Sequence, residues 1–384
     1  MIAELTFWIC LLLLVYVYVG YPGFIAALAA LRPRPVRRAP IRPRVTLLIA
    51  AHDEAATIGA KLANCLSLDY PADLLDIVVA SDGSTDGTVT VARASGSDRV
   101  TVIEFATRRG KPSVLNDTVP KCRGEIVVLS DARQLYDRGA IVALVENFAD
   151  PAIGAVSGEL HLTTGREHGI GDGVSAYWSY EKLIRRSESR FDSTVGVTGA
   201  IYAIRRDLFE AIPADTLLDD VLIPMRAVRR GYRVVFEAKA KAFDRTSDTP
   251  GAEFVRKVRT TSGTLQLLER ERWLWRIGTN RVWLQALSHK FLRVLGPFLL
   301  AGLFAATCSL AASNAGFRLA LVAQVTFYAA ALGGFLLRGR SAVGRCLAAP
   351  SAFCLMNYAA LVGVARFLRG TQPVTWDRAA PAIR

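Results

Sequence analysis

The sequence predicts a Rossmann-like α/β domain flanked by transmembrane helices, and three observations support this fold class. The chain has 384 residues, of which 52% are hydrophobic, a high share for a soluble protein. Long uncharged runs lie near both ends, and short apolar runs alternate with helix-like stretches between them. The formal net charge is +13, from 47 basic and 34 acidic residues. Basic residues beside apolar runs are typical of membrane proteins, so we expect membrane lipids and no nucleic acid as partners.

The first uncharged run, Leu5–Leu31, predicts a transmembrane helix over residues 1–31. At about 1.5 Å per residue, such a helix spans the roughly 30 Å hydrocarbon core of a bilayer. A basic, proline-rich linker follows at residues 32–44, with six arginines and four prolines. Because cytoplasmic flanks carry an excess of basic residues, we expect this linker and the domain behind it in the cytoplasm.

Three further runs predict C-terminal transmembrane helices within residues 294–369, followed by a basic tail at 370–384. They are Val294–Phe317, Leu319–Leu337 and Cys346–Ala365. Pro350 allows a re-entrant or interfacial helix in place of a third full span. Residues 251–293 contain alternating tryptophans and arginines and predict interfacial amphipathic helices, with a soluble helix packed on the domain as the alternative.

Four short β-branched runs predict a parallel sheet in the middle of the chain. The runs cover residues 45–51, 75–81, 100–105 and 125–131. Helix-like stretches cover residues 55–66, 85–94, 111–119 and 138–148. Ligands of such sheets bind beyond the carboxyl ends of the strands, so functional residues are expected there.

Three of these strand ends are acidic. They contain His52, Asp53 and Glu54 after the first strand, Asp82 and Asp86 after the second, and Asp131 and Arg133 after the fourth. Each acid alone has a simpler explanation as a helix cap. Carboxylates that converge on one edge repel one another unless they bind a cation or hydrogen-bond donors, so together they predict a ligand site. No G-x-G-x-x-G motif follows a strand, which disfavours a dinucleotide-binding dehydrogenase.

Four motifs at these strand ends resemble the nucleotide-sugar domain of family 2 inverting glycosyltransferases, which have the GT-A fold. They are HDEAATI (52–58), ASDGSTDGT (80–88), RRGKPSVLN (108–116) and LSDAR (129–133). The resemblance continues with VTGAIYAIRRDLF (197–209), LLDDVLIPMRAVRRGYRVVF (217–236) and RKVRT (256–260), the last standing where the family's synthases carry Gln-x-x-Arg-Trp. It implies a GT-A domain over residues 45–250. The whole chain is similar to the membrane-embedded cellulose, chitin, hyaluronan and poly-N-acetylglucosamine synthases.

The resemblance implies that a UDP-sugar donor binds at the first two strand ends. His52, Asp53 and Glu54 are expected to line the nucleoside pocket. Asp82 is expected to accept a hydrogen bond from uracil. Lys111, in the RRGK stretch, is expected to hold the base or the diphosphate.

The fourth strand end is expected to hold the cofactor, a divalent metal such as Mg²⁺ or Mn²⁺. By resemblance, Asp131 binds the metal that bridges the donor diphosphate. Arg133 stands where the family has a second aspartate, so the metal has one fewer protein ligand. The guanidinium of Arg133 faces phosphate or, alternatively, pairs with a neighbouring carboxylate.

Transfer of a sugar requires a base, because the attacking hydroxyl is a poor nucleophile. A carboxylate that takes its proton contributes about 10²–10⁴-fold. The family pattern assigns this role to Asp220, supported by Asp219; both acids also suit a helix N-terminus, and the two roles are compatible. Arg256 and Arg259 are expected to close over the diphosphate. Trp178 is expected to stack on the acceptor sugar or, alternatively, to be a core residue.

These features predict a multi-pass enzyme of the inner (plasma) membrane that transfers sugar from a UDP-sugar to a growing β-linked glycan. One alternative is a non-processive transferase that adds a single sugar to a lipid-linked or short acceptor, which the missing tryptophan of RKVRT favours. The other is a non-catalytic subunit that binds a nucleotide sugar. A homo-oligomer is compatible with all three.

Overall fold

The computed structural model describes residues 1–162, 170–244, 250–337 and 347–375, so the end of the predicted basic tail lies outside it. Within these residues the chain forms two compact units. The sheet unit takes its residues from 32–163, 188–246 and the segment from 373 onward. The helical unit takes its residues from 1–31, 164–187 and 247–372, so residues 164–187 group with the helices although they fall inside the predicted 45–250 domain.

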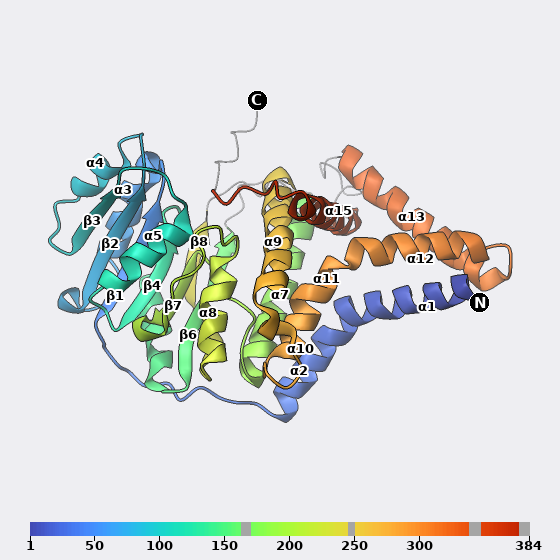
Figure 1. Cartoon of the computed structure of the whole chain (residues 1–384), viewed down its shortest axis with the longest axis horizontal. Helices are drawn as coiled ribbons and strands as arrows, with labels where there is room; N and C mark the ends of the chain where they lie inside the picture. Colours follow the sequence, from blue (N-terminus) through green and yellow to red (C-terminus); the bar gives the residue numbers. More distant parts are fainter. Residues whose placement is uncertain (163–169, 245–249, 338–346, 376–384) are drawn as a thin grey trace. The chain divides into compact units, whose positions relative to one another are not determined.

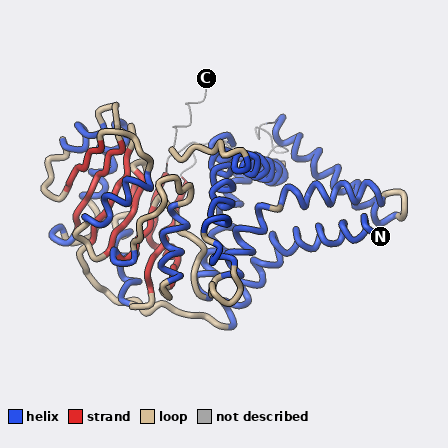
Figure 2. Tube along the Cα trace, in the orientation of Figure 1, coloured by secondary structure: helices blue, strands red, loops and turns tan. Residues whose placement is uncertain are grey.

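The sheet unit is built on an eight-stranded mixed sheet with strand order β3-β2-β1-β4-β7-β6-β8-β5 (Figures 1 and 2). The strands are β1 Val45–Ala51, β2 Leu75–Asp82, β3 Val100–Phe105, β4 Ile126–Asp131, β5 Leu135–Tyr136, β6 Ile153–Leu162, β7 Ile201–Arg205 and β8 Arg233–Asp244. The four predicted strands are confirmed and pair in parallel as β3-β2-β1-β4. The other half was not predicted, and there β7 runs antiparallel to both β4 and β6.

The four helical stretches that the sequence predicts in this unit are also confirmed. The unit's main helices are α3 Ala55–Leu66, α4 Thr88–Arg93, α5 Lys111–Thr118, α6 Ala140–Val145 and α8 Asp219–Arg229. α4 begins at Thr88 and not at residue 85, because the residue before it, Gly87, has a φ of 87° and cannot be part of the helix. The Asp86 carboxylate accepts a hydrogen bond from the Thr88 amide at 3.1 Å and holds this turn. Side chains such as Leu47, Ile77 and Val128 are fully buried in the core. Their burial fixes the strand ends that carry the acidic residues.

Three helices of the helical unit are long and apolar enough to cross a membrane, among the residues described. They are the continuous run Ile2–Leu31, which comprises α1 Ile2–Val15, a π-helical turn and α2 Tyr21–Leu31, together with α13 Ala315–Leu337 and α15 Ala348–Leu368. A fourth candidate is a pair bent by 58°, Trp283–Val294 with α12 Gly296–Leu310. Each is a candidate span by length and composition.

The uncharged run Val294–Phe317 contains the break between two helices, at its C-terminal end. α12 ends at Leu310 and α13 begins at Ala315. The side-chain oxygen of Asn314 accepts a hydrogen bond from the Phe317 amide at 3.1 Å, which caps the start of α13. Pro350 does not interrupt α15, because it lies in the first helical turn, where its missing N–H is not needed.

The segment predicted to lie at the membrane interface begins with one long helix, α9 Pro250–Arg270. One face of α9 packs closely on α15: the Ser262 hydroxyl donates to the Gly363 carbonyl at 2.8 Å. Val258 and Thr261 of α9 are buried. Gly363 therefore lies where two helix backbones approach each other.

We expect Gly363→Ala to destabilise the helical unit by about 1–3 kcal/mol through overpacking. Its added β-carbon would lie 2.7 Å from both the Val258 carbonyl oxygen and the Thr261 β-carbon. Gly23→Ala in α2 is the matched control, because nothing lies within 4 Å of its added β-carbon. Thermal unfolding of the full chain in detergent measures both. Equal losses of stability would contradict the close packing of α9 on α15.

Candidate active site

The acidic strand ends predicted from the sequence come together at one edge of the sheet. β1 lies between β2 and β4, with Ala51 opposite Ser81 and Ala50 opposite Asp131. The residues that follow β1 and β2 therefore meet beside the end of β4. This placement agrees with the expectation of a single ligand site at the carboxyl ends of the strands.

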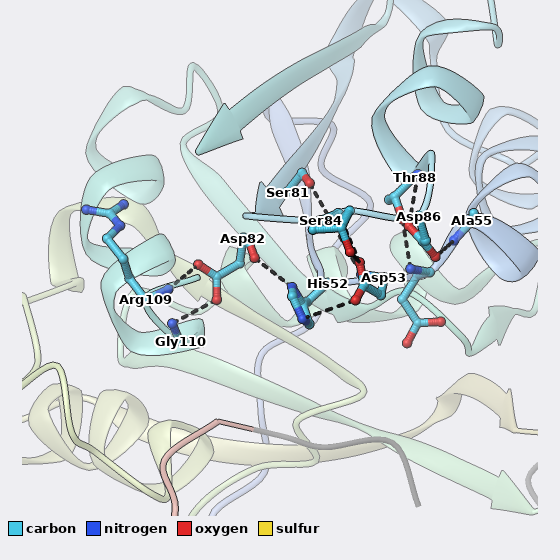
Figure 3. Close-up of polar contacts among 12 residues, drawn as sticks. His52, Asp53, Ala55, Ser81, Asp82, Ser84, Asp86, Thr88, Arg109 and Gly110 are labelled. Atoms are coloured by element: carbon cyan, nitrogen blue, oxygen red, sulfur yellow. Dashed lines mark hydrogen bonds and ion pairs between the residues drawn. The ribbon is translucent and has the colours of Figure 1, made fainter. Parts of the chain in front are cut away.

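Hydrogen bonds tie the loop after β1 to the loop after β2 (Figure 3). The Asp53 carboxylate accepts from the Thr85 amide at 2.8 Å, and the Asp53 amide donates to the Ser84 hydroxyl at 3.1 Å. Nδ1 of His52 lies 2.7 Å from the Asp82 carbonyl oxygen. Asp53 has a φ of 52°, in the left-handed region that non-glycine residues rarely adopt, and these bonds hold it there. His52 and Asp53 thus shape the loops, and their contacts with a nucleoside stay predictions.

The Asp82 carboxylate anchors the RRGK loop. It is 6% exposed, and its two oxygens accept from the backbone amides of Arg109 at 2.7 Å and Gly110 at 2.8 Å (Figure 3). The neighbouring Gly83 has a φ of 61°, and an added β-carbon would lie 2.4 Å from the Arg108 nitrogen. Only glycine permits this approach, so Asp82 and Gly83 together place the residue that follows the loop, Lys111. The predicted uracil contact of Asp82 remains untested.

Lys111 joins two of the predicted functional carboxylates. Its Nζ lies 2.8 Å from Oδ1 of Asp131 and 3.5 Å from Oδ2 of Asp219. Burial lowers the pKa of Lys111, but the nearby charges of Asp131, Asp219 and Asp220 outweigh burial and raise it above its ordinary value. The ammonium is therefore charged at every physiological pH.

Asp219 and Asp220 open helix α8, as the helix N-terminus interpretation predicts. Asp219 is 8% exposed. The Asp220 carbonyl accepts from the Val197 amide at 2.9 Å. A β-carbon on Gly199 would lie 3.4 Å from Oδ2 of Asp220. The loop before β7 thus packs directly against the proposed base.

Arg133 lies near a neighbouring carboxylate, as the second of its two interpretations predicts. Its Nε lies 3.9 Å from Oε1 of Glu54, at the limit of an ion pair. The other oxygen of Glu54 accepts from the Thr57 hydroxyl at 2.7 Å. Arg133 therefore links the ends of β4 and β1, and a contact with phosphate stays a prediction.

The residues present fit a metal that is shared with a diphosphate. Among the described residues, no group of three or more histidine, cysteine or acidic side chains is placed to hold a metal ion. Mg²⁺ commonly takes only one or two carboxylates and completes its shell with substrate phosphates and water. Asp131, whose side chain is 42% exposed, can supply such a carboxylate.

The comparison with protein families agrees with this geometry. The family model described as "Glycosyltransferase like family 2" matches residues 43–275, more than half of the chain. This chain belongs to glycosyltransferase family 2. The match covers the whole site described above and extends into α9.

Individual relatives of this family 2 chain include two curated synthases and one solved structure. The poly-β-1,6-N-acetyl-D-glucosamine synthase of Staphylococcus aureus is 25% identical over 233 residues, 59% of this chain and 56% of that protein. The synthase of the same name from Staphylococcus epidermidis is 23% identical over 235 residues. The matched part thus spans little more than half the length of these relatives. The mannosyltransferase PcManGT of Pyrobaculum calidifontis, solved with GDP-Man and Mn²⁺, is 25% identical with a TM-score of 0.74. The alignment covers 96% of this chain and 100% of that one, which confirms the GT-A fold with its added helices.

Sequence reasoning missed one buried cation of this family 2 site, Lys61 on α3. Its side chain is fully buried, and Nζ donates to the Gln134 carbonyl at 2.6 Å and lies 3.7 Å from the centre of the Tyr136 ring. Burial lowers the pKa of Lys61, while the charge of Asp131 opposes that shift. Lys61 thus supports the turn that follows the metal-binding candidate. The sequence feature that would have indicated its burial is its position on the apolar face of the predicted helix 55–66.

Trp178, Arg256 and Arg259 belong to the helical unit of this family 2 chain. Arg256 pairs with Glu253 at 2.7 Å, and its guanidinium lies 6.0 Å from the centre of the Trp178 ring. Arg259 is 9% exposed. Their roles toward diphosphate and acceptor stay predictions.

We expect Asp82→Asn to lower the free energy of unfolding by about 1–3 kcal/mol, because an amide nitrogen cannot accept the second backbone hydrogen bond. The matched control is Asp117→Asn. The carboxylate of Asp117 lies 2.7 Å from the guanidinium of the same Arg109, and the Asp117 side chain is 43% exposed. An exposed ion pair of this kind contributes about 0–1 kcal/mol. Denaturant unfolding measures both variants, and a control that loses as much as Asp82→Asn would show that the loop does not depend on Asp82.

Proposed function

We propose that this chain is a membrane-bound inverting glycosyltransferase that transfers sugar from a UDP-sugar to a growing β-linked glycan. The observation that carries the proposal is the cluster around Lys111. The metal-binding candidate Asp131 lies 2.8 Å from this ammonium, Asp219 lies 3.5 Å from it, and the proposed base Asp220 adds to its field. The names of the staphylococcal relatives support a polysaccharide as product.

A second candidate function is the addition of one sugar to a lipid-linked or short acceptor. The mannosyltransferase aligns with nearly the whole of this chain, and its name states transfer of a mannosyl group and, unlike the names of the synthases, no polymer. RKVRT also lacks the tryptophan of the synthase motif. Because the mannosyltransferase was solved with GDP-Man, GDP-sugars belong beside UDP-sugars in any test of the donor.

The proposed reaction is a single displacement. The acceptor hydroxyl attacks the anomeric carbon, the bond from that carbon to the diphosphate oxygen breaks, and the nucleoside diphosphate leaves with the bonding electrons. Asp220 takes the hydroxyl proton as general base. Lys111 supplies positive charge near the leaving group, where negative charge grows. A divalent cation held by Asp131 would add positive charge to the diphosphate.

The candidate membrane spans support a reaction at a membrane. These spans and the basic linker at residues 32–44 support a multi-pass protein of the inner membrane whose sheet unit lies in the cytoplasm. That orientation gives the site access to cytoplasmic nucleotide sugars. Whether the chain acts alone or as a homo-oligomer does not change the proposed chemistry.

We expect Asp220→Asn to reduce turnover by about 10²–10⁴-fold, because the amide cannot take the proton. Release of nucleoside diphosphate from a panel of UDP- and GDP-sugars, with the protein in nanodiscs, measures this. Asp98→Asn, at an exposed acid, is the control and should turn over normally. An unchanged rate in Asp220→Asn would overturn the assignment of the base. The length of the product on a gel separates polymer synthesis from a single addition.

We also expect chelation of divalent metal to abolish turnover, and Mn²⁺ or Mg²⁺ to restore it. Asp131→Asn should raise the metal concentration needed for half-maximal activity by roughly tenfold or more, since it removes the charged ligand. Calorimetry of nucleotide binding gives a second readout: metal should tighten binding to the unmodified protein and not to the variant. Tight, metal-dependent binding to Asp131→Asn would place the metal elsewhere.

A further inference from the structure

The side chain of Tyr202 lies close enough to feel the charges of the same three carboxylates that surround Lys111. Tyr202 lies on β7, opposite Leu129 of β4 and Ser157 of β6. Asp131 follows Leu129 by two residues and so shares its face of the sheet. Tyr202 is fully buried.

The hydroxyl of Tyr202 is a buried donor without an acceptor in the part of the chain that the structure describes. Such groups are rare in native proteins and point to a function or to a second state of the molecule. Burial, followed by the charges of Asp219, Asp220 and Asp131, holds the pKa of Tyr202 well above its ordinary value. The hydroxyl is therefore a protonated donor close to three negative charges.

Asp219 carries the matching atom. Its Oδ2 is buried and, among the described residues, has no hydrogen-bond partner, although Nζ of Lys111 lies 3.5 Å away as an ion pair. A buried carboxylate from which a paired cation is removed is strongly disfavoured. If Lys111 turns toward the diphosphate of a bound donor, Asp219 needs another partner.

We propose that Tyr202 is a positioning residue that replaces Lys111 on Asp219 when the donor binds. Its hydroxyl then donates to Oδ2 of Asp219 and keeps the start of α8, including Asp220, in place while Lys111 serves the diphosphate. The movement of Lys111 rests on the proposed function. The ability of the Tyr202 hydroxyl to bind Asp219 in place of Lys111 does not rest on the proposed function, and it can be tested without any donor.

The test is a thermal unfolding cycle on the full chain in detergent, with Tyr202→Phe, Lys111→Met and the double variant. In the unmodified protein the hydroxyl is idle, so Tyr202→Phe should leave the melting temperature unchanged or raise it. In the Lys111→Met background the hydroxyl already serves Asp219, so the same change should lower the melting temperature. A loss of stability of equal size in both backgrounds, or no loss in either, overturns the proposal.

Tyr70→Phe is the matched control for this cycle. Its hydroxyl donates to the Pro43 carbonyl at 2.6 Å, away from Lys111, so its loss should lower the melting temperature equally in both backgrounds. If Lys111→Met does not fold, the shift in melting temperature on adding nucleoside diphosphate and Mn²⁺ replaces it. That shift should be smaller in Tyr202→Phe than in the unmodified protein, with turnover reduced roughly tenfold or more. An equal shift together with full turnover overturns the proposal, and leaves the assignment of Asp220 untouched.

Discussion

The ion pair between Lys111 and its carboxylates is the interaction on which the site depends. Asp131, Asp219 and Asp220 come from β4 and the start of α8, and three such charges would repel one another without a cation. The position of Lys111 is itself fixed from the preceding loop, because Asp82 binds the backbone amides of Arg109 and Gly110. The buried carboxylate of Asp82, at the end of β2, thus positions the ammonium of Lys111 beside the end of β4. This chain of contacts connects the residues predicted to bind the nucleoside with those predicted to be catalytic.

The same ion pair limits the carboxylate oxygens that are available to a divalent metal at this edge of the sheet. Asp131 already shares its Oδ1 with Lys111, and Arg133 pairs weakly with Glu54 at 3.9 Å. If Asp131 holds the metal as predicted, it offers a half-exposed carboxylate, and the diphosphate is expected to supply further ligands. Metal and donor are therefore expected to bind together, because the diphosphate completes the ligand shell of the metal.

Much of this was predictable from the sequence, for physical reasons. β1, β2 and β4 are apolar runs rich in β-branched residues and buried on both faces, while β3 at the edge of the sheet is partly exposed. The rule that ligands bind at strand carboxyl ends made the acidic residues there candidates for a site. The second half of the sheet was not predicted. β6 contains Gly154 and Gly158, whose added β-carbons would lie 2.7 Å from Tyr232 and the Ala240 carbonyl, so its pattern lacks a clear strand signal. The pairing of Lys111 with Asp219 joins residues far apart in the chain, and no spacing reveals it.

Two buried acids of this protein differ in how their carboxylate oxygens are paired. The difference distinguishes an acid that stabilises packing from one that we propose to function in the site. In the helical unit, both oxygens of Glu181 are paired: His289 lies 2.8 Å from one, and Arg293 binds the other. Because both of its oxygens are occupied, Glu181 stabilises packing and leaves no carboxylate oxygen for a ligand. At the sheet edge, Oδ2 of Asp219 and the hydroxyl of Tyr202 are buried without hydrogen-bond partners among the described residues. Native structures keep few such atoms, because each one costs stability. The unpaired oxygen of Asp219 lies 3.5 Å from the ammonium of Lys111, which supports our proposal that this edge changes its contacts when the donor binds.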